Sequence, residues 1–185
     1  MLPTEVETCF RSFVGAFTAD DPLPAGGSAG VASIAVGVGL ARKVLTISRG
    51  EGDAGEDVGR LCAALSEVAA RLEVEFARDC RAFAAVLDAL RMPREHDRRT
   101  ACVREAWCEA VAAPVAVVEL AQRARAALEQ CAVHVKRSMR ADLAAALDLV
   151  ACGRRIAVRN ARDNAARLEV SDAERLLAPI GREQP

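Results

Sequence analysis

The stretch that decides the fold is PLPAGGSAGVASIAVGVGLARKVL, residues 22–45. No charged side chain occurs between Pro22 and Ala41, yet the same run contains Gly26, Gly27, Gly30, Gly37 and Gly39. Each glycine inside a helix costs roughly 0.5–1 kcal/mol relative to alanine. We therefore expect a buried helix whose bare surface lets neighbouring backbones approach closely. The candidate contact pairs, each four residues apart, are Gly26 with Gly30 and Ala35 with Gly39.

The composition of the 185-residue chain favours helices throughout. Hydrophobic residues make up 52% of the sequence, but aromatic residues only 3%, and tyrosine is absent. Alanine, leucine, arginine and glutamate favour helices, whereas strands are typically rich in aromatic and β-branched residues. The sequence predicts an all-α fold: one domain over residues 1–185, a bundle of about five long helices with the glycine-rich helix at its centre.

Hydrophobic periodicity and helix-breaking residues give approximate bounds for these helices. Ser28 is the predicted N-cap of the glycine-rich helix, and Pro114 is expected to kink the fourth helix. A break is expected within SRGEGDAGED, and the terminal EQP is expected to fray. The predicted helices cover residues 4–17, 28–48, 56–90, 98–130 and, after a break near residue 134, a last stretch to 168.

Charge and cysteine content narrow the class of protein. The net charge of −1 gives no overall basic field for nucleic acid, and we expect no nucleic-acid partner. Eight basic and three acidic residues between Lys136 and Arg167 give a local net charge of +5. This stretch is either a solvated helix face or a surface for a small polyanion.

Seven scattered cysteines without a CxxC pair, and no secretory leader, favour the cytoplasm. The prolines, glycines and serines of residues 22–41 favour a buried helix over a membrane span.

Two places in the sequence could bind a ligand. The first is PAGGS, residues 24–28, where backbone N–H groups and a hydroxyl at a helix start suit an anion or a carbonyl oxygen. The alternative is an ordinary loop that leads into a helix. Neither histidine, His96 or His134, is followed three or four residues later by a ligating partner, so no metal site is expected.

The second place is the last long helix. Asn160 and Asn164 are one turn apart and form a small polar patch, and Asp142 precedes Asn160 by eighteen residues. On one unbroken helix Asp142 and Asn160 would share a face but stand roughly 27 Å apart. Either the helix breaks near Gly153, or the residues serve different sites, or a second subunit brings them together. Taken alone, Asp142 is also a normal acid for the start of a helix.

Four blocks of the chain, in order, resemble the cyclodeaminase/cyclohydrolase family, which comprises the helical domain of formiminotransferase-cyclodeaminase and its stand-alone bacterial relatives. The resemblance runs from about residue 8 to about residue 168. The family's Pro-Gly-Gly-Gly-Ser loop is matched by residues 24–28, and its Asp-x-x-Ala-Phe block by Asp79, Ala82 and Phe83, before Met92 and Pro93. Its Ser-Asp step falls on Ala141 and Asp142, and its paired asparagines fall on Asn160 and Asn164.

This resemblance implies an enzyme of one-carbon tetrahydrofolate chemistry. Such enzymes either hydrolyse 5,10-methenyltetrahydrofolate, as a cyclohydrolase, or close formimidoyltetrahydrofolate with loss of ammonia, as a cyclodeaminase (a lyase). The resemblance implies a homodimer, a folate substrate near the subunit interface, and neither metal nor redox cofactor. It makes Asp142 the catalytic acid–base group. The implied substrate-binding residues are Gly26, Gly27, Ser28, Asn160 and Asn164, with Lys136, Arg137 and Arg140 as receivers of the glutamate tail.

The chain departs from the family pattern close to Asp142. Val135 and Lys136 stand where the family has Gly-Asn, Ala141 replaces the serine, and Ala25 replaces the first loop glycine. These changes remove hydrogen-bonding groups that would support the orientation of Asp142. A second hypothesis therefore stays open: a non-catalytic helical dimer that binds folate or regulates. A third is a related ring-opening or ring-closing enzyme for another pterin-like substrate.

Overall fold

The computed structural model describes residues 4–48 and 53–181, and within this part the chain is helical and contains no strand. The prediction of an all-α bundle is therefore confirmed. The α-helices are α1 (Thr4–Ala16), α2 (Gly26–Ser48), α3 (Asp53–Arg91), α4 (Arg99–Cys131), α5 (Arg140–Ala165) and α6 (Val170–Leu177). Two short 3-10 turns, Arg137–Met139 and Ala178–Ile180, precede α5 and follow α6.

The bounds of the long helices agree closely with the sequence prediction, and the differences concern their ends. Helix α2 begins at Gly26, so Ser28 is not its N-cap but a fully buried residue of its first turn. The last predicted helix was expected to reach residue 168 but ends at Ala165, and the sequence analysis missed α6. Part of SRGEGDAGED and the terminal EQP lie outside the described residues.

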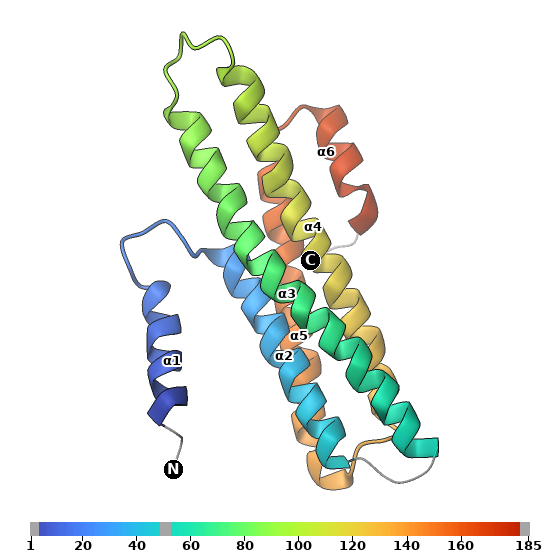
Figure 1. The fold of residues 1–185 in the computed structure, drawn as a ribbon. Helices are drawn as coiled ribbons and strands as arrows, with labels where there is room; N and C mark the ends of the chain where they lie inside the picture. Colours follow the sequence, from blue (N-terminus) through green and yellow to red (C-terminus); the bar gives the residue numbers. More distant parts are fainter. Residues whose placement is uncertain (1–3, 49–52, 182–185) are drawn as a thin grey trace.

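Helices α2, α3, α4 and α5 form one elongated bundle (Figure 1). The α3–α4 hairpin extends beyond the start of α2, and α6 packs beside α4. An ion pair secures this packing: Arg104 Nε and Nη2 donate to the two carboxylate oxygens of Asp172, at 2.6 and 3.0 Å. Because Asp172 is buried at the start of α6, the charge-assisted pair ties this short helix to the bundle.

Helix α2 is the central apolar element, as predicted. By length and composition it could also cross a membrane, but in this structure it packs against α3 and α5. Its fully enclosed side chains include Ile34, Val38, Val44 and Leu45. Burying each such side chain contributes roughly 1.5–3 kcal/mol, so this helix supplies much of the core.

Helices α2 and α5 approach each other at glycines. A Cβ atom placed on Gly153 would lie 2.4 Å from the carbonyl oxygen of Gly30, and one placed on Gly37 would lie 2.8 Å from that of Ala146. Neither position has room for a side chain. The predicted close approach exists, but only Gly30 among the four named residues takes part in it. A Cβ on Gly26 or Gly39 would meet nothing within 4 Å.

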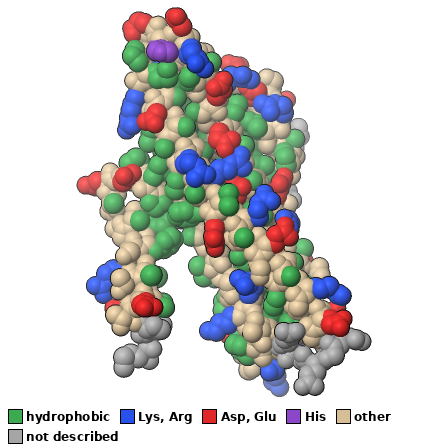
Figure 2. Space-filling model, viewed as in Figure 1, with side chains coloured by type: hydrophobic (Ala, Val, Ile, Leu, Met, Phe, Trp, Pro, Cys, Tyr) green, Lys and Arg blue, Asp and Glu red, His purple; other side chains and the backbone are tan. Residues whose placement is uncertain are grey.

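Helix α1 stands apart from the bundle (Figure 1) and buries none of its residues. Its aromatic side chains Phe10 and Phe13 are 67% and 44% exposed. In Figure 2, hydrophobic side chains gather where this helix meets the bundle. There Phe13 borders an apolar groove of about 440 Å³, together with Val31, Ala35 and Val36 of α2 and Phe76 of α3.

We predict that Gly153→Ala destabilises the protein because the new methyl group would push α5 away from Gly30 and Ile34. The free energy of unfolding should fall by about 1–3 kcal/mol, the usual cost of overpacking. Gly59→Ala is the matched control, since a Cβ there meets nothing within 4 Å and should add up to about 1 kcal/mol of helix propensity. Urea unfolding followed by circular dichroism measures both. A Gly153→Ala variant as stable as Gly59→Ala would contradict the contact.

Candidate functional site

A cavity of about 330 Å³ opens where the start of α2 meets α3, α4 and α5. This size lies within the range of small-molecule sites, roughly 300–1,000 Å³. Its polar side chains come from two helices, Asp79 from α3 and four residues of α5. The lining residues are Leu23, Ala25, Gly26, Gly27, Asp79, Phe83, Ala110, Ile156, Arg159, Asn160, Asp163 and Asn164.

The first turn of α2 brings bare backbone against a carboxylate. A Cβ atom on Gly27 would lie 2.4 Å from Asp79 Oδ1 and 2.5 Å from Asn160 Nδ2, so a side chain there would force these groups to shift. One residue later, the buried Ser28 hydroxyl donates to Asp79 Oδ2 at 2.7 Å. Cys80 Sγ lies 3.3 Å from the same hydroxyl. The first turn of α2 therefore lies against both Asp79 and Asn160, and its Ser28 supplies the hydrogen bond that orients Asp79.

The two asparagines of α5 both line this cavity, one turn apart, as their spacing suggested. Asn164 Nδ2 donates to the carbonyl oxygen of Ala110 on α4 at 2.7 Å. That bond orients the amide and leaves its oxygen as an acceptor. Gly26 and Gly27 line the cavity as well, whereas Ser28 reaches it through Asp79. The role of these residues in substrate binding stays a prediction.

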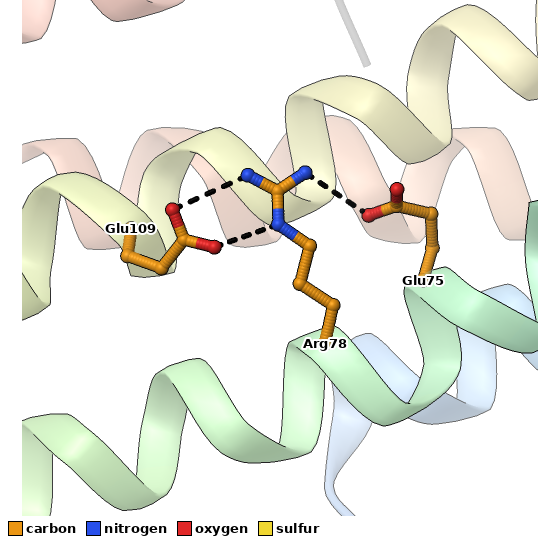
Figure 3. A network of polar contacts seen from close by, with 3 residues as sticks. All are labelled: Glu75, Arg78 and Glu109. Carbon is orange, nitrogen blue, oxygen red and sulfur yellow. Dashed lines mark hydrogen bonds and ion pairs between the residues drawn. The ribbon is translucent and has the colours of Figure 1, made fainter.

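An ion network beside the cavity, buried at Glu75 and exposed at Glu109, joins α3 to α4 (Figure 3). Arg78 donates through Nε and Nη2 to Glu109 at 2.6 and 3.2 Å, and through Nη1 to Glu75 at 3.2 Å. The Glu75 side chain is only 5% exposed, and Arg78 provides the opposite charge beside it. Because Arg78 precedes Asp79 and Glu109 precedes Ala110, the network holds two lining residues in place.

Partial burial raises the pKa of the Asp79 carboxyl above its ordinary value, since the charged form loses solvation. The hydrogen bonds from Ser28 oppose this effect by favouring the carboxylate. The neighbouring cation, Arg78, is directed toward Glu75 and Glu109 instead (Figure 3). Asp79 thus combines a raised pKa with a fixed orientation at a cavity wall, a combination typical of functional carboxyls.

The other predicted residues lie at the opposite end of α5. This helix is continuous from Arg140 to Ala165, so the proposed break near Gly153 is wrong. Asp142 lies in its first turn and does not line the cavity. Lys136, Arg137 and Arg140 belong to the same end. The backbone N–H of Lys136 donates to Ser48 Oγ at 3.1 Å and its Nζ to the carbonyl oxygen of Ile47 at 2.8 Å.

Sequence analysis gave no role to three charged residues of the cavity: Asp79, Arg159 and Asp163. Asp79 was visible only as part of the Asp-x-x-Ala-Phe block. Arg159 and Asp163 lie beside the two asparagines in sequence, and Arg159 also belongs to the basic stretch from Lys136 to Arg167 that could meet a small polyanion. Within residues 4–48 and 53–181, no group of three or more His, Cys, Asp or Glu side chains could hold a metal ion.

Comparison with known proteins agrees with the fold and the motifs. The profile of the formiminotransferase-cyclodeaminase family matches residues 9–177, and the chain belongs to this family. Mouse formimidoyltransferase-cyclodeaminase is 32% identical over 155 residues, which are 80% of this chain and 29% of the mouse protein. The pig protein is 30% identical over 150 residues. The chain thus spans less than a third of the length of these relatives.

A solved structure adds a comparison of folds. Formiminotetrahydrofolate cyclodeaminase from Thermotoga maritima superposes with a TM-score of 0.83, covering 92% of this chain and 85% of the other. Its sequence is 21% identical to this one, so the likeness concerns the arrangement of the helices. The site must still be argued from the residues of this chain.

We predict that Asp79→Asn has a higher free energy of unfolding than the wild type, and that the difference grows as pH rises above about 4. An acid whose pKa is raised by folding binds its proton more tightly in the native state than in the unfolded state. Its native form therefore loses stability as pH rises from the unfolded pKa, near 3.8, through the folded pKa. Asparagine still accepts the Ser28 hydrogen bond but has no charge to desolvate. Urea unfolding of both proteins between pH 4 and 8 tests this, and a difference that shrinks with rising pH would contradict the burial of Asp79.

Proposed function

We propose that this protein transforms a one-carbon tetrahydrofolate in the cavity between α2, α3, α4 and α5. The reaction is either hydrolysis of 5,10-methenyltetrahydrofolate or ring closure of 5-formimidoyltetrahydrofolate with release of ammonia. One observation carries the proposal: the Gly26–Ser28 turn, the asparagine pair of α5 and a partly buried carboxyl converge on one cavity of ligand size. Membership of the family and the names of its relatives support the choice of substrate.

The charges of the cavity suit both reactions. The methenyl form carries a positive charge at the reacting carbon, and the carboxylates of Asp79 and Asp163 would stabilise that charge. The amides of Asn160 and Asn164 offer both donors and acceptors, as the polar edge of a pterin requires. The exposed Arg159 at the same cavity can receive a carboxylate of the glutamate tail.

The roles predicted for residues at the opposite end of α5 stay predictions, and these residues do not line the cavity of their own chain. Asp142, as acid–base group, and Lys136, Arg137 and Arg140, as tail-binding residues, could reach this cavity only from a second copy of the chain. Lys136 bonds to Ser48 and Ile47 at the end of α2, and neither it nor the other altered residue, Val135, lines the cavity. These departures from the family pattern therefore leave the cavity residues of the same chain in place.

The absorbance of methenyltetrahydrofolate tests the proposed function with purified protein. Its loss reports hydrolysis, and its appearance from the formimidoyl substrate reports ring closure. Gly27→Ala should lower kcat/KM on the order of 10²-fold, because its methyl group must displace Asp79 or Asn160. Gly26→Ala, whose Cβ meets nothing within 4 Å, should lose less.

Tight folate binding without turnover of either substrate would favour the non-catalytic module instead. Turnover of a different pterin alone would favour the third hypothesis. A Gly27→Ala variant as active as the wild type would place the reaction outside this cavity.

We also propose that the protein acts as a homodimer in the cytoplasm. Seven free cysteines fit a reducing compartment. A helix of 13 residues such as α1 is marginal on its own in water, so its exposed phenylalanines need a covering surface. The exposed Val36 of α2 continues the same apolar surface across the groove, which a second copy would cover.

Sedimentation or light scattering should give about twice the 19.6 kDa mass of one chain. Val36→Asp should shift the protein toward monomer because it places a charge on the apolar surface. Val133→Asp is the matched control, since Val133 is 85% exposed and lies away from the groove. A monomeric wild-type protein, or equal effects of the two variants, would contradict the proposed interface.

A further inference from the structure

Contacts between neighbouring helices form a closed belt around the cavity, and each contact involves a lining residue or its neighbour in sequence. The four contacts are Ser28–Asp79 (α2 with α3), Arg78–Glu109 (α3 with α4), Ala110–Asn164 (α4 with α5) and Asn160–Gly27 (α5 with α2). In the Arg78–Glu109 contact neither side chain lines the cavity. The role of this contact is therefore not direct binding of a ligand.

The Arg78–Glu109 contact is a two-point ion pair (Figure 3). Arg78 donates through Nε and Nη2 to the two carboxylate oxygens of Glu109, at 2.6 and 3.2 Å. Paired bonds of this kind fix the direction as well as the distance between their partners. The third donor, Nη1, bonds at 3.2 Å to Glu75, one turn earlier on α3, and so restrains the guanidinium from its other side. The ion pair therefore sets the position of α4 relative to α3 at the level of the cavity.

The position of α4 decides how Asn164 is oriented. Glu109 is followed by Ala110, whose carbonyl oxygen accepts the Asn164 amide at 2.7 Å. Because this acceptor is a backbone atom, a shift of α4 would carry it away from the amide. Asp79 and Asn160 are held by contacts with α2, which do not depend on α4. An effect of the ion pair on the cavity should therefore run through Asn164.

We propose that Arg78 and Glu109 are positioning residues: their ion pair holds the Ala110 carbonyl oxygen where it orients Asn164 for the substrate. The proposal rests on the proposed function, in which the amide of Asn164 binds the polar edge of the pterin. It gives a role in substrate affinity to an ion pair that is partly exposed. Such pairs usually contribute little to stability, so affinity and stability should respond differently to its loss.

The chain offers a matched control for this ion pair. Arg123 of α4 donates to Glu67 of α3 at 2.9 Å, so this pair also bridges the two helices. The acids of the two pairs, Glu109 and Glu67, are 48% and 62% exposed. Glu67 precedes Arg78 by eleven residues, about 17 Å along the helix, and does not line the cavity. Substituting the acid rather than Arg78 keeps the cation beside the buried Glu75.

The test compares Glu109→Gln with Glu67→Gln in calorimetric binding of 5-formyltetrahydrofolate and in steady-state kinetics. Glu109→Gln should weaken binding about tenfold, less than the roughly 10²-fold that a 1 Å misplacement can cost. KM should rise by a similar factor while kcat changes less than about threefold, because the contacts of Asp79 and Asn160 remain. Glu67→Gln should leave affinity and KM within about twofold of the wild type. Both variants should shift the urea midpoint equally little, since exposed ion pairs add little to stability.

A double-mutant cycle tests the route through Asn164. In an Asn164→Ala background, Glu109→Gln should raise KM by less than about threefold, because the amide on which the ion pair acts is absent. Glu109→Asp keeps the charge but is too short for both bonds, so its KM should lie between those of the wild type and Glu109→Gln. This further variant keeps the proposal testable even where Glu109→Gln folds poorly.

Equal folate affinities of Glu109→Gln and Glu67→Gln, with a wild-type protein that binds folate, would overturn the inference and leave the proposed function standing. Fully additive effects of Glu109→Gln and Asn164→Ala would overturn it too, because the ion pair would then act at another place. A wild-type protein that neither binds nor turns over a folate would defeat the proposed function, and this inference with it.

Discussion

The backbone contact between α2 and α5 is the constraint on which the rest of the structure depends. The two helices run antiparallel, and Gly30 meets Gly153 while Gly37 meets Ala146 further along. Between these points the Ser33 hydroxyl donates to the carbonyl oxygen of Leu149 at 2.9 Å. Side chains at the two glycine contacts would force the helices apart, and the apolar core of α2 would open with them.

The same contact sets the geometry of the candidate site. One turn before Gly30, Gly27 lies against Asn160, and α3 brings Asp79 to the same point. The Arg78 network fixes α3 to α4 next to it (Figure 3). The cavity is therefore a consequence of helix packing, with its polar groups on rigid helices rather than on a mobile loop. Rigid support of this kind is what precise positioning of a reacting group requires.

The sequence predicted the helices well because their signals are local. Glycine spacing also predicted a tight contact, but it selected Gly26 and Gly39 in error. The face of α2 that meets α5 depends on Gly153, which lies more than a hundred residues away. Asp79 shows the same limit: α3 carries several carboxyls, and only its packing against Ser28 distinguishes this one. Helix geometry did give the separation of Asp142 from Asn160, and the unbroken α5 excludes one of the three explanations offered for it.

The most direct test of the account is a crystal structure of the wild-type protein with 5-formyltetrahydrofolate bound. The account predicts the one-carbon group beside Asp79, the pterin against Asn160 and Asn164, and the glutamate tail extending past Arg159. It also predicts that no residue of the first turn of α5 from the same chain touches the ligand. A folate bound at Asp142, with the cavity beside Gly27 left to solvent, would contradict the central claim.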